Sequence, residues 1–369
     1  MQLTMRGTAI VVTILSSIGF TVILLISEMA QYHFQQIGHL YRPSHAYETC
    51  IMTRIKNCHH LLPQWIEYHF QSGVEHFFIS NDCSEDPRTL FWLEQYEARG
   101  IVTVFYNQSY NDCQHQPNEA LHFRFLLGQS KSSCRWIGAI DVDEYIFPSN
   151  KHTSISFIKE VLIKHKFPLV RMPWVYMYHM GYEEFPNDLV INAYRDGHPI
   201  GTAHIKSFAM TEYILDWTSS HYPRFYRDVY TIPGSGIDIS DYAHDYLTKH
   251  GEIKTVKMND SDCNYPVSPF YIRHYYIRAW ADYLETKVNR KYASDGSVNR
   301  YAADDTVARE RWSSNKGNVE TKCSLPGEEH KELISPIILN SVLKNFEILI
   351  TQNQSAPIDL YYRWLSGDY

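Results

Sequence analysis

Between residues 48 and 140 the sequence alternates short apolar runs, which are typical of strands, with longer amphipathic runs, which are typical of helices. Helical crossovers join parallel strands, and a parallel sheet is buried on both faces. We expect strands at residues 49–53, 76–80, 101–105 and 136–140, and helices at 62–71, 90–99 and 118–131. The sequence therefore predicts an α/β fold with a mostly parallel central sheet flanked by helices.

The last of these strands is followed by the acidic segment Asp141-Val142-Asp143-Glu144. Alternate residues of a strand point the same way, so we expect Asp141 and Asp143 to share one face, with Glu144 opposite and able to fix the strand end by an ion pair. Ligands of open α/β sheets bind at the carboxyl ends of strands, and paired carboxylates there favour a divalent cation. The alternative is an acidic strand end without a ligand. A second triplet, Asp260-Ser261-Asp262, has no strand before it and is expected to be a solvated loop.

Residues 8–27 carry no charge. At about 1.5 Å per residue, a helix of this length crosses a hydrocarbon layer of about 30 Å. Arg6 before the segment and Glu28 after it favour a cytosolic N-terminus. The alternative is a cleaved signal peptide, but the apolar segment is longer than those of signal peptides, and no small-x-small cleavage site follows it. We expect a cytosolic tail at 1–7, a transmembrane anchor at 8–27 and a stem at 28–46.

Three Asn-x-Ser sequons, at Asn107, Asn259 and Asn353, agree with a body in the secretory pathway. Seven cysteines allow at most three disulfides, and no Cys-x-x-Cys spacing occurs, which argues against a structural zinc site. The formal net charge is −7 and no Lys/Arg block is present, which argues against a nucleic-acid partner.

Beyond residue 148 the alternation changes to aromatic-rich segments, at 172–178 and 221–226, which predict a less regular half. Aromatic rings with polar tips suit sugar faces as well as protein cores. Near the C-terminus, residues 332–350 have the spacing of an amphipathic helix, and 351–369 are expected to be a loosely packed tail.

Several segments occur in an order that resembles glycosyltransferase family 92. They are Trp-Ile-Glu-Tyr-His at 65–69, residues 73–82, residues 136–146, and a His-Tyr-Tyr stretch at 272–280 that leads into a Lys/Arg-rich helix. The resemblance covers about residues 48–295. It implies a GT-A fold, a type II membrane anchor and a Golgi or other secretory-pathway membrane. It also implies transfer of a hexose, galactose among them, from a UDP-sugar to a glycan or glycoconjugate. Residues 174–181 depart from the family's Phe-Gly-Ser-Ser-Gly pattern and keep only Gly181.

This resemblance gives the body of the chain, residues 47–350, an expected division. Residues 47–148 would form a nucleotide-binding half and 149–350 an acceptor half. A Mn²⁺ or Mg²⁺ ion that bridges two phosphates would neutralise the leaving diphosphate. Asp143 is expected to be its direct ligand, and Asp141 to reach the ribose or, through water, the metal. GT-A enzymes often take another ligand from a late histidine, for which His221 and His274 are candidates; the alternative for each is a structural histidine.

Other polar residues are expected around the same nucleotide. Asn81 and Asp82 follow the second strand, where they either bind the uracil or ribose or cap an Asx turn. Lys206 is a candidate phosphate contact, with a solvated surface lysine as the alternative. An inverting reaction needs one carboxylate to take the proton of the acceptor hydroxyl. The sequence leaves three candidates for this base: Glu183, Glu184 and Asp216.

Two other classes of protein share some of these sequence features. A phosphatase with Asp-x-Asp would place it after its first strand, with Thr or Val two residues beyond the second acid. Here three strands come earlier, and Tyr145 holds that position. A noncatalytic, membrane-tethered carbohydrate-binding protein of the same fold would show the same sequence features, so it remains the alternative to a transferase.

Overall fold

The computed structural model describes residues 45–106, 119–149, 154–164, 168–199, 204–221, 223–225, 255–257, 264–266, 268–288, 305–314, 325 and 327–347. The chain divides into two units, Met1–His45 and Ala46–Tyr369, and the described residues belong almost entirely to the second. Several predicted features lie outside the described residues: the anchor at 8–27, the three sequons, the second Asp-x-Asp triplet and the tail at 351–369. Within the described ranges, no helix has the length and apolar character needed to cross a bilayer.

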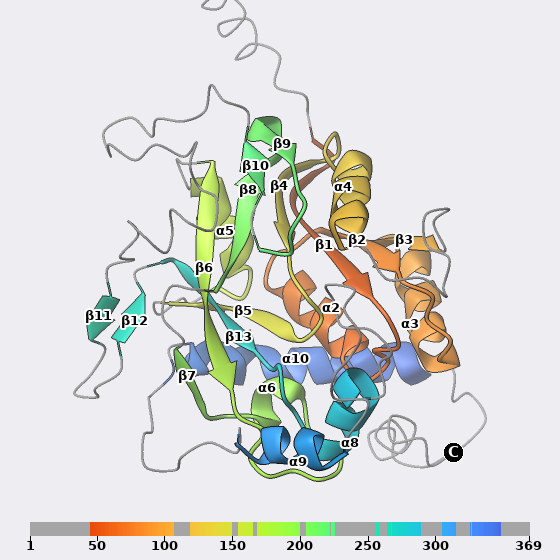
Figure 1. Ribbon diagram of the computed structural model, residues 1–369. Helices are drawn as coiled ribbons and strands as arrows, with labels where there is room; N and C mark the ends of the chain where they lie inside the picture. Colours follow the sequence, from red (N-terminus) through yellow and green to blue (C-terminus); the bar gives the residue numbers. More distant parts are fainter. Residues whose placement is uncertain are drawn as a thin grey trace, which may run out of the picture. The chain divides into compact units, whose positions relative to one another are not determined.

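One mixed sheet organises the described part of the second unit (Figure 1). Its strands follow the order β3-β2-β1-β4-β8-β6-β13-β5, and β7 pairs with β6. The strand bounds are β1 Tyr47–Ile55, β2 His76–Asn81, β3 Val102–Tyr106, β4 Cys134–Ala139, β5 Glu144–Pro148, β6 Leu169–Met177, β7 Gly197–Pro199, β8 Ile205–Met210 and β13 Phe270–His274. Two short pairs lie apart from it: β9 Ile214–Asp216 with β10 Arg224–Phe225, and β11 Thr255–Lys257 with β12 Asn264–Pro266.

The N-terminal part of this sheet is parallel throughout. The pairs β1–β2, β2–β3 and β1–β4 are all parallel, so these four strands end at the same edge. The antiparallel pairs, β4–β8, β6–β8, β6–β7 and β5–β13, lie in the second part, where β6–β13 adds one more parallel pair. The predicted α/β fold with a mostly parallel sheet is therefore confirmed, and the loss of alternation beyond residue 148 corresponds to the antiparallel strands.

Both faces of the parallel part are covered by helices. Alternate residues of β1 and β2 enter different cores: Ile51 and Phe77 pack with α2 (Leu62–Gln71) and α3 (Pro87–Ala98), whereas Met52 and Phe78 pack with α4 (Glu119–Ser130). Because both faces are buried, each strand carries a run of consecutive apolar residues, at 50–52 in β1 and 77–79 in β2, rather than a strict alternation. The three predicted helices are confirmed, and the bounds of α2 agree with the prediction at both ends.

Local sequence signals explain where these helices begin and end. Pro63 lies in the first turn of α2, where its missing N–H is tolerated, and Gly73 follows the helix with a φ of +107°. A Cβ at Gly73 would also lie 2.9 Å from the Cβ of Lys159. At α3, Asp86 caps the N-terminus by accepting from the Arg88 N–H at 2.8 Å.

Helix α2 also fixes the edge strand β5. Trp65 Nε1 donates to the carbonyl of Glu144 at 2.9 Å, and the Tyr68 hydroxyl donates to the carbonyl of Ile146 at 2.6 Å. His69 Nε2 accepts from the Ile146 N–H at 3.3 Å. These bonds satisfy backbone groups that an edge strand would otherwise expose. They also hold the strand that begins directly after the acidic segment 141–143.

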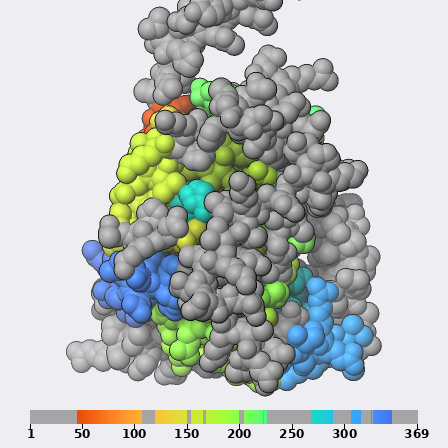
Figure 2. Space-filling view, turned by 90° about the vertical axis from the view of Figure 1, so that its left-hand side faces the viewer, coloured from red at the N-terminus to blue at the C-terminus, as the bar shows by residue number. Residues whose placement is uncertain are grey.

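The C-terminal helix α10 (Glu328–Glu347) packs on α2, and the surface view shows its outer side exposed (Figure 2). Its buried residues recur every fourth position: His330, Ile334, Ile338 and Val342. At its start, Glu328 forms an ion pair with the fully buried Arg273 of β13, with 2.7 Å between Oε1 and Nη2. The remaining helices are α5 (Phe157–Lys164), α6 (Val190–Ala193), α8 (Trp280–Tyr283) and α9 (Asp305–Ser314), and residues Leu284–Val288 form one π-helical segment.

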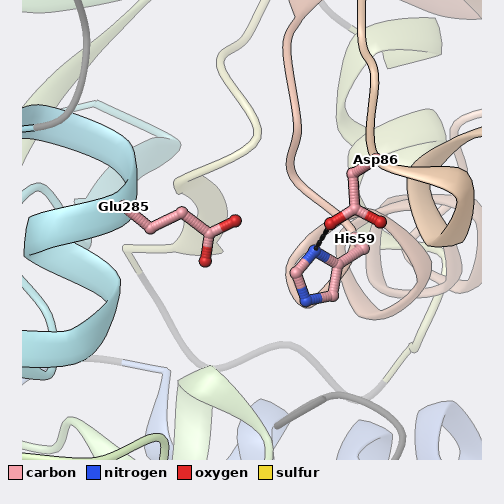
Figure 3. Close-up of side chains that lie close together, drawn as sticks. All are labelled: His59, Asp86 and Glu285. Atoms are coloured by element: carbon pink, nitrogen blue, oxygen red, sulfur yellow. Dashed lines mark ion pairs between the residues drawn. The ribbon is translucent and has the colours of Figure 1, made fainter.

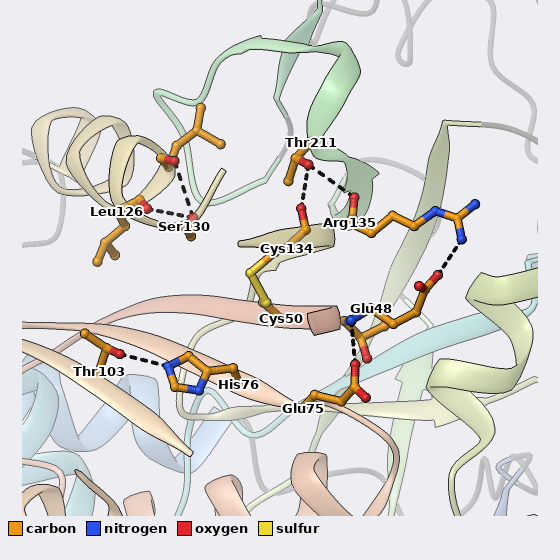
Figure 4. Close-up of a disulfide and its surroundings, with 12 residues drawn as sticks. Glu48, Cys50, Glu75, His76, Thr103, Leu126, Ser130, Cys134, Arg135 and Thr211 are labelled. Carbon is orange, nitrogen blue, oxygen red and sulfur yellow. Dashed lines mark hydrogen bonds and ion pairs between the residues drawn. A yellow bond between two sulfur atoms is a disulfide. The ribbon is translucent and has the colours of Figure 1, made fainter. Parts of the chain in front are cut away.

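A disulfide joins Cys50 of β1 to Cys134 of β4 (Figure 4). Thr211 Oγ1 donates to the carbonyl of Cys134 at 2.6 Å, and Arg135 pairs with Glu48 at 2.8 Å beside it. The two cysteines are fully buried. Disulfides of this kind are typical of proteins that fold in oxidising compartments.

Candidate functional site

The acidic segment is a turn that connects β4 to β5. The predicted strand at 136–140 is observed at Cys134–Ala139, and the Glu144 N–H donates to the carbonyl of Asp141 at 3.0 Å. The expectation that strand alternation orients these acids was wrong, because Asp141 and Asp143 lie in the turn rather than in the strand. The predicted ion pair of Glu144 is present: its carboxylate lies 3.2 Å from Lys206 Nζ.

Asp143 is the most strongly held of these acids. Its side chain is 12% exposed and faces three basic side chains. One of them, His274, is the last residue of β13, and the other two, Arg278 and Lys287, belong to the segment that follows this strand. His274 Nε2 lies 3.6 Å from Oδ1, while Lys287 Nζ at 3.4 Å and Arg278 Nη1 at 3.6 Å face Oδ2. Burial alone would raise the pKa of Asp143, but Lys287, His274 and Arg278 together hold it well below its usual range. Asp143 is therefore a carboxylate at neutral pH.

Asp141 and Glu144 share a different cation. Lys206 on β8 is fully buried, and its Nζ lies 2.7 Å from Asp141 Oδ2 and 3.2 Å from Glu144 Oε2. Burial opposes the charge on Lys206, but Asp141 and Glu144 raise the pKa of the ammonium. Burial also raises the pKa of Glu144 in spite of the lysine. Lys206 is thus a buried charge that holds the acidic turn, rather than the solvated surface lysine of the alternative reading.

Both histidine candidates contact Trp174 of β6. The His274 ring lies 4.3 Å from the Trp174 ring, centroid to centroid, and the His221 ring lies 5.4 Å away. His221 Nδ1 lies 2.9 Å from the carbonyl of Ile205, which fixes the tautomer with the proton on Nδ1 and leaves Nε2 as the lone-pair nitrogen. Burial lowers the pKa of His274, and burial with the nearby Lys206 lowers that of His221 to about 4. Both rings are therefore neutral at neutral pH, the form that binds metals.

Asp143 and His274 together fit a divalent cation. Two ligand atoms that are each about 2.1 Å from a metal lie about 3.0–3.4 Å apart at octahedral to tetrahedral angles, close to the 3.6 Å between Asp143 Oδ1 and His274 Nε2. His274 Nδ1 is buried and makes no hydrogen bond within the part of the chain that the structure describes. The charges of Lys287 and Arg278 oppose a cation that arrives alone. They suit one that arrives with a diphosphate, whose oxygens supply both negative charge and further ligands.

Asn81 and Asp82 lie at the carboxyl end of β2, as predicted. Asn81 Oδ1 accepts from the Ser84 N–H at 3.1 Å, so the side chain does cap an Asx-type turn. Asp82 lies 3.6 Å from Arg54 Nε of β1, and the side chains of both Asn81 and Asp82 are buried. Because β1, β2 and β4 are parallel, this edge is the same one at which the acidic turn begins.

The three candidate bases lie at the protein surface or close to it. Glu183 is paired with Arg309 of α9, which lowers the pKa of that carboxyl. Asp216, at the end of β9, is paired with Arg124 of α4 at 2.8 Å, and this hydrogen bond likewise lowers its pKa. Glu184 is exposed. The structure therefore brings Asp141, Asp143, Lys206 and His274 together but assigns separate partners to Glu183 and Asp216, and the identity of the base stays a prediction.

Sequence reasoning missed Lys287, Arg278 and Trp174 as members of this site. Lys287 is 144 residues from Asp143 in the chain, so no local pattern connects them. Arg278 lies within the His-Tyr-Tyr stretch, where its only signal was its place in a basic segment. Trp174 lies in the segment that departs from the expected glycine-rich pattern, and that departure was the available signal.

Comparison with known proteins identifies the family. The model of glycosyltransferase family 92 matches residues 45–261, more than half of the 369-residue chain. A glycosyltransferase family 92 protein of Arabidopsis thaliana is 31% identical over 106 residues, which is 28% of this chain and 17% of that protein. Proteins of the same description match from Ricinus communis, at 30% over 104 residues, and from Oryza sativa subsp. japonica, at 27% over 111 residues. They cover 27% and 29% of this chain, respectively, and in each case 17% of the relative, so the chain matches about a sixth of the length of these curated relatives. By its match to the family model, this chain belongs to glycosyltransferase family 92.

Proposed function

We propose that this chain transfers a hexose, galactose by preference, from a UDP-sugar to a glycan or glycoconjugate acceptor with the help of Mn²⁺ or Mg²⁺. The observation that carries the proposal is the convergence of Asp143, His274, Lys287 and Arg278 beside the acidic turn. An ionised carboxylate, a neutral imidazole and two fixed cations suit a metal-bound diphosphate. A UDP-sugar presents that group where its glycosidic bond breaks.

Each residue would have a defined task in this reaction. When bound, a divalent metal ion would supply positive charge that stabilises the leaving UDP. Asp143 and His274 would hold that ion. Lys287 and Arg278 would contribute positive charge that is already fixed in place, so that little reorganisation is needed as negative charge develops. Lys206 would hold Asp141 toward the ribose or toward a water on the metal.

The remaining parts of the donor and acceptor sites follow the parallel strands. Asn81 and Asp82 would contact the uracil or ribose at the carboxyl end of β2, where nucleotides bind in open α/β sheets. In a GT-A arrangement, residues 149–350 would bind the acceptor. One of Glu183, Glu184 and Asp216 would then take the proton of the acceptor hydroxyl, with inversion at the anomeric carbon.

We also propose that the enzyme is a single-pass type II protein of the Golgi or of another secretory-pathway membrane. The uncharged segment at 8–27 has the length of a membrane span. The buried disulfide between Cys50 and Cys134 suits the oxidising lumen in which the body of the chain would then lie.

The test is UDP release by the full-length protein, with a panel of UDP-sugars, mixed glycan acceptors and Mn²⁺. We expect release from one UDP-hexose, with UDP-galactose the first candidate, and loss of the activity in EDTA. Asp143→Ala should lower the rate at least about 100-fold, because loss of a direct metal ligand should cost at least as much as loss of a residue that hydrogen-bonds to such a ligand. The exposed Asp188→Ala is the matched control and should keep the wild-type rate.

Circular dichroism must show that both variants are folded. Equal rates for Asp143→Ala and the wild type would refute the assignment of Asp143. Binding of glycans without UDP release from any donor would instead support the noncatalytic carbohydrate-binding alternative.

A further inference from the structure

A second group of metal-binding side chains lies away from the acidic turn. His59 follows β1, Asp86 caps α3, and Glu285 lies in the π-helical segment Leu284–Val288. Their ligand atoms all lie within 4.8 Å of one another. Across the described ranges, this is the one group of three or more His, Cys, Asp or Glu side chains that meets this limit. It contains no cysteine, so the spacing of cysteines in the sequence gave no information about it.

The geometry of these three side chains suits a metal ion. His59 Nδ1 lies 3.0 Å from Asp86 Oδ2, the separation of two ligands on one metal with bonds of about 2.1 Å. Figure 3 shows Glu285 on the opposite side of the gap, with its carboxylate pointing toward the His59–Asp86 pair. A movement of about 1 Å in the long glutamate side chain would complete the set, given metal–oxygen bonds of about 2.0–2.2 Å.

The charges around the group are unbalanced without a cation. In Figure 3 an ion pair joins His59 to Asp86, whereas the Glu285 carboxylate is paired with neither of them. Burial raises the pKa of the Glu285 carboxyl, and so do the neighbouring carboxylates Asp282 and Asp86, although His60 and Arg88 oppose them. Arg88 pairs with Asp86 at 2.7 Å, but its side chain is 27% exposed and can turn into water. Asp282 already forms an ion pair with Arg278, and its Oδ1 lies 2.8 Å from His60 Nε2.

We propose that His59, Asp86 and Glu285 bind a divalent transition-metal ion, with Zn²⁺ as the best match. One imidazole nitrogen and two carboxylate oxygens are ligands that zinc accepts, and water can complete a tetrahedral site. The ion joins the loops after β1 and β2 to the segment that follows β13. That segment carries Arg278 and Lys287 to Asp143, so the metal is structural and holds this segment in place.

The site is tested with Zn²⁺ alone, in the absence of nucleotide, on full-length protein that has been stripped with EDTA. We expect one equivalent of Zn²⁺ by calorimetry and by elemental analysis, together with a rise in the thermal unfolding midpoint. Glu285→Gln should weaken binding more than about 100-fold and abolish that rise. Asp86→Asn should do the same while keeping a good N-cap for α3. Glu310→Gln, an exposed change on α9, is the matched control and should bind as the wild type does.

Asp143→Asn separates this site from the proposed donor site, and we expect it to retain the nucleotide-independent equivalent of Zn²⁺. The proposal is overturned if the wild type binds no Zn²⁺, or if Glu285→Gln and Asp86→Asn bind it as tightly as the wild type. It is also overturned if Asp143→Asn removes this equivalent. As a control for folding, the metal-free variants should unfold at the same temperature as the metal-free wild type. Their loss of Zn²⁺ binding then cannot be caused by unfolding.

Discussion

Replacing Lys206 with methionine should reveal how much the buried charge network stabilises the fold. Lys206 and Glu144 are both fully buried, with 3.2 Å between Nζ and Oε2. Removing one partner of a buried ion pair leaves an uncompensated charge and typically costs about 3–5 kcal/mol. The Asp141 side chain is 38% exposed, so water can solvate its carboxylate once the lysine is removed. Loss of the Lys206–Asp141 ion pair therefore adds only roughly 0.2–1 kcal/mol to the cost. We therefore expect Lys206→Met to lower the free energy of unfolding by about 3–5 kcal/mol.

A double-mutant cycle with Glu144→Gln isolates the interaction. Glutamine can still accept from the Asp141 N–H, which bonds to Glu144 Oε2 at 3.0 Å, but it carries no charge. The double variant should lose less stability than the sum of the two single variants, by about 1–3 kcal/mol. The loss in Lys206→Met should also shrink as the pH falls, because the unpaired Glu144 carboxyl then takes up a proton.

The assay is urea unfolding of the full-length protein in detergent, followed by tryptophan fluorescence. Lys159→Met is the matched control, because Lys159 forms an ion pair with Glu75 in which both side chains are about one-third exposed. That change should cost at most about 1 kcal/mol. A loss below about 1 kcal/mol in Lys206→Met, or strict additivity in the cycle, would refute the role given to this lysine.

Two further predictions concern stability. Burial lowers the pKa of His69 to about 3, below its ordinary value of 6.5. The stability that depends on a neutral His69 is therefore fully present above pH 6.5 and is lost as the pH falls toward 3. At about 1.36 kcal/mol per pH unit, the protein should lose about 2 kcal/mol between pH 6.5 and 5 through this residue. His69→Gln should lose correspondingly less in urea unfolding at the two pH values, and an equal loss would contradict the argument. Glu328→Gln removes the charge that faces the buried Arg273 and should cost about 1–3 kcal/mol, whereas the exposed Glu332→Gln on the same helix should change little. Equal unfolding midpoints for these two glutamate variants would show that Arg273 does not need its partner.

Sequence patterns predicted the parallel half of the fold well because its signals are local. Pro63 and Gly73 mark the ends of α2, and the apolar runs of β1 and β2 reflect burial on both faces. The strand β6 was missed because it contains Pro173 and because its aromatic residues fit a core or a binding surface equally well. Its neighbours in the sheet, β8 and β13, come from distant parts of the chain.

The sequence predicted only those residues of the candidate site that lie together in one segment of the chain. The position of Asp141 and Asp143 after a buried strand was visible in the sequence, but their conformation was not, since a turn follows β4. The partners Lys206, Arg278 and Lys287 reach the turn through tertiary packing. Nothing in the local sequence of a lysine distinguishes a fully buried one from a solvated one, and Lys206 was therefore assigned to phosphate rather than to Asp141 and Glu144.

The most direct test of the proposed donor site is calorimetric binding of UDP with and without Mn²⁺. If Asp143 and His274 hold the metal against the diphosphate, Mn²⁺ should tighten UDP binding to the wild type by roughly 5–150-fold, a typical range for coupled ligands. Asp143→Asn should bind UDP weakly and equally in both conditions. An unchanged Mn²⁺ effect in Asp143→Asn, or no Mn²⁺ effect in the wild type, would contradict a metal-assisted UDP-sugar site at this turn.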